Sequence, residues 1–195
     1  MIQYILEKQG SYWAQGDTVK FIAKAFAYGF ALTLAGVVSV DAKTLRVTID
    51  NIDEKGVGAA IGTIELEDTN DGLRIAPDLK GLAPGPHGFH IHANGSCGPT
   101  EQNGKLTAGM AAGGHFDPLN TGKHRGPLSA EGHKGDLPVL VVDSQGEAHT
   151  PILAPHLKVD DLAGHSVMVH AGGDNYADEP APLGGGGARI ACGTF

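Results

Sequence analysis

The chain has 195 residues, a length that suits one domain or one domain with an extension. Glycine fills 30 positions, about twice its usual share of roughly 7%, whereas 18% of the residues are charged and 6% are aromatic, so turns are expected to be frequent and helices few. The formal net charge of -8 excludes a sequence-independent grip on nucleic acid phosphates, which needs a basic surface.

Residues 1–42 are typical of a secretory signal peptide. Lys20 and Lys24 precede the apolar run 25–40, and small residues at the end of the segment supply the site that signal peptidase accepts. A membrane anchor is the alternative, but this run has sixteen uncharged residues, fewer than the roughly 20 that span a bilayer. We therefore predict export with cleavage before Lys43.

The segment that precedes these basic and apolar residues is unusually long for a signal peptide. Residues 1–18 add nothing that such a peptide needs, and the signal would begin more naturally at Val19 if the natural start lies there. In either case we expect one mature domain over residues 43–195, with no membrane association after cleavage. Three acidic and three basic residues precede Lys43, so the mature domain keeps the net charge of -8.

From position 43 onward, short apolar segments alternate with glycine and proline. Leu45, Val47 and Ile49 alternate with polar residues, which predicts a strand with one buried face, and residues 53–56 predict a turn. Further β-type runs lie at 60–67, 137–142, 166–170 and 188–191. Outside the signal segment no window has a 3.6-residue apolar period. We predict an all-β domain of seven or eight strands, a sandwich or a barrel closed by Greek-key connections.

The interval 93–136 fits no strand pattern and is rich in glycine and proline. A connection of this length in a compact domain is usually functional or disordered. It contains His115, His124 and His133, each nine residues after the last, with Asp136 three positions further on. Three imidazoles and one carboxylate form a complete tetrahedral set that suits structural zinc. We expect a metal to order this interval.

A second histidine pattern lies before and after that interval. His90 and His92 stand two apart on a predicted strand, so their side chains project from the same face and can converge on one ion. His170 follows an apolar run near the C-terminus. Any one of these histidines taken alone could be an ordinary surface residue. The ordered series as a whole, in a chain with ten histidines, favours metal binding.

These motifs resemble those of the copper-zinc superoxide dismutases of the bacterial, exported type, from about residue 43 to the C-terminus. The segments that carry the resemblance are GFHIH at 88–92, GGHFDP at 113–118, GDLP at 135–138, VHAGGDN at 169–175 and GGGGARIACG at 184–193. The resemblance implies an eight-stranded Greek-key β-barrel with long metal-binding and electrostatic loops. It also implies dismutation of superoxide to dioxygen and hydrogen peroxide, with copper and zinc as cofactors.

The family's ligand pattern can be carried over residue by residue. It implies that copper is held by His90, His92, His115 and His170. It implies that zinc is held by His115, His124, His133 and Asp136. His115 would then bridge the two metals and carry a proton to the nascent peroxide. The chemistry of the donors agrees, since an all-imidazole set suits Cu(II) and a tetrahedral nitrogen and oxygen set suits zinc.

The same resemblance assigns four more residues. Arg189 would receive the anion over the copper, and Asp174 would hydrogen-bond a copper histidine, His90, and a zinc histidine, His124. Cys97 and Cys192 match the family's intrasubunit disulfide, which persists only in an oxidising compartment. The cysteine pair and the signal segment therefore both point to the periplasm of a bacterial source. Lys105 is a further candidate for steering superoxide, although a solvated loop lysine explains it equally well.

Other histidines and other functions fit the sequence less well. His87 is three residues before His90 and is expected to face away from the pair, and His149, His156 and His165 have no ligand partners at suitable spacing. A copper carrier would benefit from losing a ligand or the anion receptor, and both are present. A zinc hydrolase needs an open water position, which the zinc set lacks. Family members occur as monomers and as dimers, so a homodimer stays open.

Overall fold

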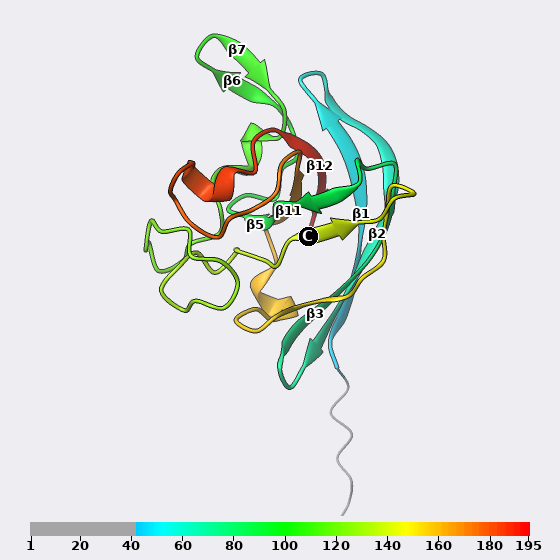
Figure 1. The fold of residues 1–195 in the computed structure, drawn as a ribbon, viewed down its shortest axis with the longest axis vertical. Helices are drawn as coiled ribbons and strands as arrows, with labels where there is room; N and C mark the ends of the chain where they lie inside the picture. The colour runs from blue at the N-terminus through cyan, green and yellow to red at the C-terminus, as the bar shows by residue number, and fades with distance from the viewer. Residues whose placement is uncertain (1–41) are drawn as a thin grey trace, which may run out of the picture. The chain divides into compact units, whose positions relative to one another are not determined.

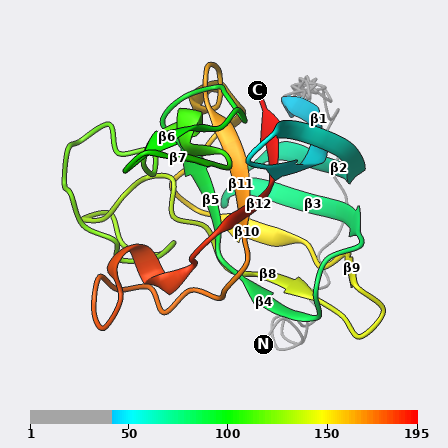
Figure 2. The same ribbon diagram turned by 90° about the horizontal axis from the view of Figure 1, so that it is seen from above.

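The computed structural model describes residues 42–195, and the predicted signal segment lies outside these residues except for Ala42. Eight strands form one curled antiparallel sheet, as predicted (Figures 1 and 2). In spatial order they are β10 (Ile152–Ala154), β3 (Gly72–Lys80), β2 (Gly56–Thr69), β1 (Thr44–Asp53), β12 (Arg189–Thr194), β11 (Ser166–His170) and β5 (Phe89–His92), with β9 (Glu147–Ala148) also paired to β3.

Two small sheets and three short 3-10 helices complete the described part of the chain. The sheets join β4 (Gly85–His87) to β8 (Leu140–Val142) and β6 (Thr100–Gln102) to β7 (Lys105–Thr107); the helices are η1 (Met110–Ala112), η2 (Val159–Asp161) and η3 (Pro182–Gly185). Figure 1 shows the β6–β7 hairpin projecting away from the curled sheet. Among the described residues, none of the helices has the length and apolar character needed to cross a membrane.

The period-2 pattern of the sequence explains how the long strands pack. Val47 and Ile49 of β1 are buried, and Ile64 and Leu66 of β2 lie opposite Val47 and Leu45 in the antiparallel register. Burying one such side chain contributes about 1.5–3 kcal/mol of hydrophobic stabilisation. The turn predicted at 53–56 joins β1 to β2. The core therefore fills the inside of the curled sheet with aliphatic side chains.

Strand β3 was not among the predicted runs, because Pro77 interrupts its apolar alternation. The structure shows why proline is tolerated there. β10 pairs with Leu73–Ile75 and β9 pairs with Leu79–Lys80, so Pro77 lies in the gap between these two short partners. The absent backbone N–H costs no ladder hydrogen bond on that side.

The prediction that the interval 93–136 contains no strand is wrong for its β6–β7 hairpin. Asn103 and Gly104 form the two-residue turn, with φ angles of 52° and 78°. Positive φ at both central positions is typical of a type I′ turn, for which Asn-Gly is the preferred pair. The flanking strands have three residues each, and five of these six residues are exposed, so no apolar alternation marks them.

The sheet brings the chemically interesting segments to one place. β5 pairs with β11, and β11 pairs with β12, so that His170 lies opposite Arg189. Two isolated bridges then attach the long connection between β7 and β8 (residues 108–139) to β5, one through His115 and one through Asp136. The connection between β11 and β12 (residues 171–188) reaches the same place, since Asp174 accepts a hydrogen bond from His90 of β5.

Candidate metal centre

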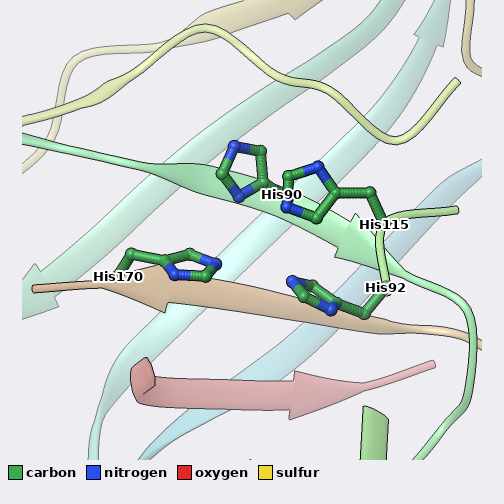
Figure 3. A group of neighbouring side chains, drawn as sticks. All are labelled: His90, His92, His115 and His170. Carbon is green, nitrogen blue, oxygen red and sulfur yellow. The ribbon is translucent and has the colours of Figure 1, made fainter. Parts of the chain in front are cut away.

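Four buried histidines converge beside β5 and β11. His90 and His92 project from one face of β5, while Phe89 and Ile91 project into the core on the other. His170 ends β11, and His115 comes from the connection that pairs with β5. Figure 3 shows the four rings pointing toward one another, and one nitrogen of each lies within 4.8 Å of the others. We call His90, His92, His115 and His170 the four-histidine group.

The hydrogen bonds of these rings decide which nitrogen is free. His90 Nε2 donates to Asp174 Oδ2 at 2.8 Å, and His92 Nδ1 donates to the Gly113 carbonyl at 3.0 Å. His170 Nδ1 donates to the Gly187 carbonyl at 3.3 Å. The opposite nitrogens, Nδ1 of His90 and Nε2 of His92 and His170, are buried and have no hydrogen-bond partner. Because an unpaired buried polar atom costs about 1–3 kcal/mol, these three lone pairs fit a metal ion at their centre.

A second group surrounds the carboxylate of Asp136. Its Oδ1 lies 2.9 Å from His115 Nδ1, 3.0 Å from His124 Nδ1 and 3.3 Å from His133 Nδ1. Four ligands placed tetrahedrally about 2.0 Å from zinc would be about 3.3 Å apart, close to these separations. Asp136 Oδ2 accepts the backbone N–H groups of residues 125 and 126. We call His115, His124, His133 and Asp136 the aspartate-containing group.

Two residues connect the groups. His115 belongs to both, with its Nδ1 on the Asp136 side. Asp174 has no exposed side-chain surface and accepts from His90 Nε2 and from His124 Nε2, each at 2.8 Å. Both rings are thereby held with Nδ1 turned toward their own group. This arrangement matches what the resemblance implies for Asp174.

In the metal-free protein, burial keeps some histidines neutral, whereas hydrogen bonds to carboxylates keep another histidine protonated. Burial lowers the pKa of His90 to about 3 and that of His170 to about 4, so both rings are neutral near pH 7 and can offer a lone pair. Burial also opposes the charged form of His124, but hydrogen bonds to Asp136 and Asp174 outweigh it and raise the pKa of His124 to about 9. Those hydrogen bonds hold the pKa of both carboxyl groups below the ordinary value despite burial.

The metal-free protein is therefore expected to lose stability as the pH falls from about 6.5 to about 4. In this window the unfolded chain protonates His90 and His170, whose ordinary pKa is 6.5, while the folded chain does not. Each such group removes at most about 1.4 kcal/mol per pH unit. The raised pKa of His124 acts in the other direction: its contribution is fully present below pH 6.5 and is lost as the pH rises toward 9.

Urea unfolding of the metal-free protein at pH 6.5, 5.5 and 4.5 measures this slope. His170→Gln is expected to reduce this slope by about 1 kcal/mol per pH unit. His156→Gln, which removes an exposed histidine outside both groups, is expected to leave it unchanged. Equal slopes in all three proteins would contradict the assignment of buried, neutral histidines.

Arg189 lies next to the four-histidine group and is held by two backbone carbonyls. Its Nη1 donates to Gly109 and its Nη2 to Gly113, each at 2.7 Å. Burial lowers the pKa of this guanidinium, which nevertheless stays cationic. The Gly113 carbonyl oxygen also accepts a hydrogen bond from His92 Nδ1. One oxygen therefore holds both the His92 ring and the Arg189 guanidinium.

The disulfide expected between Cys97 and Cys192 is present, with Cα atoms 5.7 Å apart. It joins the start of the 93–113 segment to β12 and packs in a small buried cluster with Ile52, Ala112 and Met168. Because Cys192 is three residues after Arg189 on β12, the disulfide and the guanidinium attach the same segment to the same strand.

The other histidines lie outside both groups, as predicted. His87 is buried, with its ring nitrogens 2.6 Å from the His170 carbonyl and 2.8 Å from the Ala83 carbonyl. His149 and His156 are exposed. His165 directly precedes β11, where its ring packs at a tilt against Phe116 and its Nδ1 lies 2.8 Å from the Ala93 carbonyl oxygen. Lys105 is exposed at the start of β7, on the projecting hairpin.

Two residues that contact the site were not predicted. The Tyr176 N–H donates to Asp174 Oδ1 at 2.7 Å, and its hydroxyl accepts the Val139 N–H. Asp178 Oδ2 accepts the His124 N–H at 3.0 Å. Both therefore connect the 171–188 segment to the neighbourhood of the aspartate-containing group. The only sequence signal was their position shortly after the VHAGGDN motif.

Comparisons with known proteins agree on one family. Residues 60–195 match the family model described as copper/zinc superoxide dismutase. Over 165 residues the chain is 52% identical to a protein named as a Cu-Zn superoxide dismutase from Salmonella typhimurium strain LT2, and 50% identical to one from Escherichia coli strain K12. Each alignment covers 84% of this chain and 95% of the relative.

Solved structures show the same likeness. The Cu/Zn superoxide dismutase from Brucella abortus superposes with a TM-score of 0.76 at 45% identity, and the monomeric copper, zinc enzyme from Salmonella enterica with 0.71 at 52% identity. Both comparisons cover 78% of this chain and 99% of the other.

Proposed function

Because the chain belongs to the copper/zinc superoxide dismutase family, we propose that its four-histidine group holds copper and its aspartate-containing group holds zinc. Membership makes the protein an oxidoreductase that acts on superoxide, with copper and zinc as cofactors. The observation that carries the assignment is the set of three buried ring nitrogens, on His90, His92 and His170, that have no hydrogen-bond partner. When bound, copper supplies a one-electron redox couple, and zinc supplies charge without one.

His115 is the residue to which we assign proton transfer. Its Nδ1 lies 2.9 Å from Asp136 Oδ1, which leaves Nε2 as the ring nitrogen on the side of the four-histidine group. A ring held at Nδ1 can take a proton at Nε2 and release it again while staying in place. Two superoxide anions and two protons give dioxygen and hydrogen peroxide, and His115 delivers one of those protons to the product.

Superoxide consumption by the chain from Lys43 onward, with the disulfide formed and both metals loaded, tests the proposal. We expect one copper and one zinc per chain and removal near the diffusion ceiling of about 10⁸–10⁹ M⁻¹s⁻¹, which superoxide dismutases are known to reach. A protein that binds both metals tightly without accelerating superoxide loss would instead be a copper carrier. Hydrolytic activity that needs zinc alone would contradict both functions.

Arg189 is proposed to receive the anion, since it is the cation fixed beside the four-histidine group. Arg189→Gln is expected to slow superoxide removal about tenfold or more, because local positive charge raises anion encounter rates by about 10–1,000-fold, with these enzymes a known example. The rate of Arg189→Lys should lie between those of the wild type and Arg189→Gln, since lysine keeps the charge but loses the paired hydrogen bonds to the Gly109 and Gly113 carbonyls.

The rates are to be measured at low and at physiological salt. The salt dependence should weaken in Arg189→Gln, because salt screens the charge that this variant lacks. Arg46→Gln, which removes an exposed arginine paired with Glu65 on the long sheet, is the control and should keep the wild-type rate. A wild-type rate and salt slope in Arg189→Gln would contradict the assignment.

We further propose that the domain is residues 43–195, that it is exported after removal of residues 1–42, and that it protects the periplasm from superoxide. The basic and apolar signal segment and the disulfide support this. Expression of the full chain in a Gram-negative host, with fractionation and N-terminal sequencing, is expected to give a periplasmic protein that begins at Lys43. N-terminal sequencing of the unprocessed precursor tests where translation begins. A precursor that begins at Met1 rules out a natural start at Val19.

A further inference from the structure

The Asp174 carboxylate lies directly against a glycine. Gly184 is buried and has a φ of +73°, and a Cβ placed on it would lie 2.5 Å from Asp174 Cγ and 2.8 Å from His124 Nε2. Real Cβ atoms do not approach other heavy atoms so closely. The space that Asp174 and His124 occupy therefore exists only because residue 184 has no side chain.

Gly184 has little freedom to move away from this contact. Its N–H donates to the Ala177 carbonyl and its own carbonyl accepts the Asn175 N–H, each at 3.0 Å. Both partners lie within three residues of Asp174 in the same 171–188 segment. A side chain at 184 would consequently displace the carboxylate, the imidazole or both.

We propose that Gly184 is a positioning residue of the metal centre: it lets one carboxylate reach His90 and His124 together and so sets the direction of both rings. This rests on the proposed function only in naming zinc and copper as the metals. Loss of an outer hydrogen-bond partner of a metal ligand typically costs about 10–100-fold in metal affinity. Displacement of Asp174 should weaken both sites in this range.

The neighbouring residue supplies a matched control. Gly185 has a φ of +76°, almost that of Gly184, so alanine is forced into a similar positive φ at either position. Gly185 is exposed, and a Cβ there would find only Ala181 Cβ at 3.4 Å, an ordinary contact. The two alanine variants therefore differ in the contact with Asp174 and His124 and share the strain.

The experiment measures zinc affinity by competition with a chelator, and the visible spectrum of Co²⁺ bound in place of zinc. Gly184→Ala is expected to weaken zinc by about tenfold or more and to alter the cobalt spectrum. Gly185→Ala is expected to stay within about threefold of the wild type, with an unchanged spectrum. Equal losses in the two variants would overturn the proposal, because strain alone would explain them.

A double-mutant cycle separates positioning from a general loss of structure. Asp174→Ala removes the carboxylate, which is the nearest group that the new Cβ would meet, and leaves His124 Nε2 as the remaining close atom. Gly184→Ala should therefore add a smaller loss of affinity in that background than in the wild type. An undiminished effect there would overturn the proposal. If Gly184→Ala alone fails to fold while Asp174→Ala folds, the double variant decides. A double variant that folds supports the proposal, and a double variant that also fails to fold overturns it.

These outcomes are independent of turnover. If the wild-type chain binds neither zinc nor cobalt, the proposed function fails. If the wild-type chain binds both tightly and the two glycine variants behave alike, only the role of Gly184 fails.

Discussion

His170→Ala, loaded with both metals, is expected to remove superoxide more than about 100-fold more slowly than the wild type. Loss of an outer partner of a metal ligand costs about 10–100-fold, and loss of the ligand itself should cost more. His170 belongs to the four-histidine group alone, and its Nε2 is one of the three buried nitrogens without a partner. Zinc content should therefore stay at one per chain while copper binding weakens.

Stopped-flow superoxide decay together with metal analysis of the dialysed protein makes this test. His156→Ala is the control, because it removes an exposed histidine outside both groups and should retain the wild-type rate and both metals. A His170→Ala protein that still removes superoxide at the wild-type rate would show that this group is not the copper site.

Opening the Cys97–Cys192 disulfide is expected to destabilise the metal-free domain by about 2–5 kcal/mol. The bridge spans 95 residues, for which the chain-entropy model gives about 4.7 kcal/mol. For a domain of this size each kcal/mol lowers the unfolding temperature by about 2–4 °C, so a fall of at least about 4 °C is expected. Calorimetry of the oxidised and reduced proteins measures it.

The Cys97→Ser/Cys192→Ser variant controls for effects of the reductant elsewhere. It should unfold at the temperature of the reduced wild type, and addition of reductant should not lower that temperature further. The described residues contain no other cysteine, so a further fall with reductant would mean that the bridge is not the source of the effect.

Most members of the two groups could be predicted from the sequence because they lie at spacings that have a chemical meaning, whereas His170 was found through the family resemblance. His90 and His92 occupy one face of a strand, and His115, His124 and His133 precede a carboxylate at short intervals. The strands β1, β2 and β11 could likewise be predicted from alternating or apolar runs. These features depend on residues that are close together in the sequence, so the local sequence pattern is enough to predict them.

The unpredicted features depend on residues that are distant in the sequence. Asp178 reaches the backbone of a residue 54 positions away, and nothing in its local sequence indicates that partner. Gly184 belongs to a run of four glycines whose members look alike, yet only the fold tells that one of them lies against a carboxylate. β3 was missed because the tolerance for Pro77 arises from the gap between two other strands.

The shared Gly113 carbonyl has a consequence for altering this protein by design. One oxygen accepts both His92 Nδ1 and Arg189 Nη2, and the disulfide ties the segment that carries it to β12. Under the proposed assignment, a loop redesign that moves this oxygen to retune anion capture at Arg189 would also disturb the ring of His92. Anion capture and the redox potential of copper would then be coupled, and directed evolution of one should select compensating changes in the other.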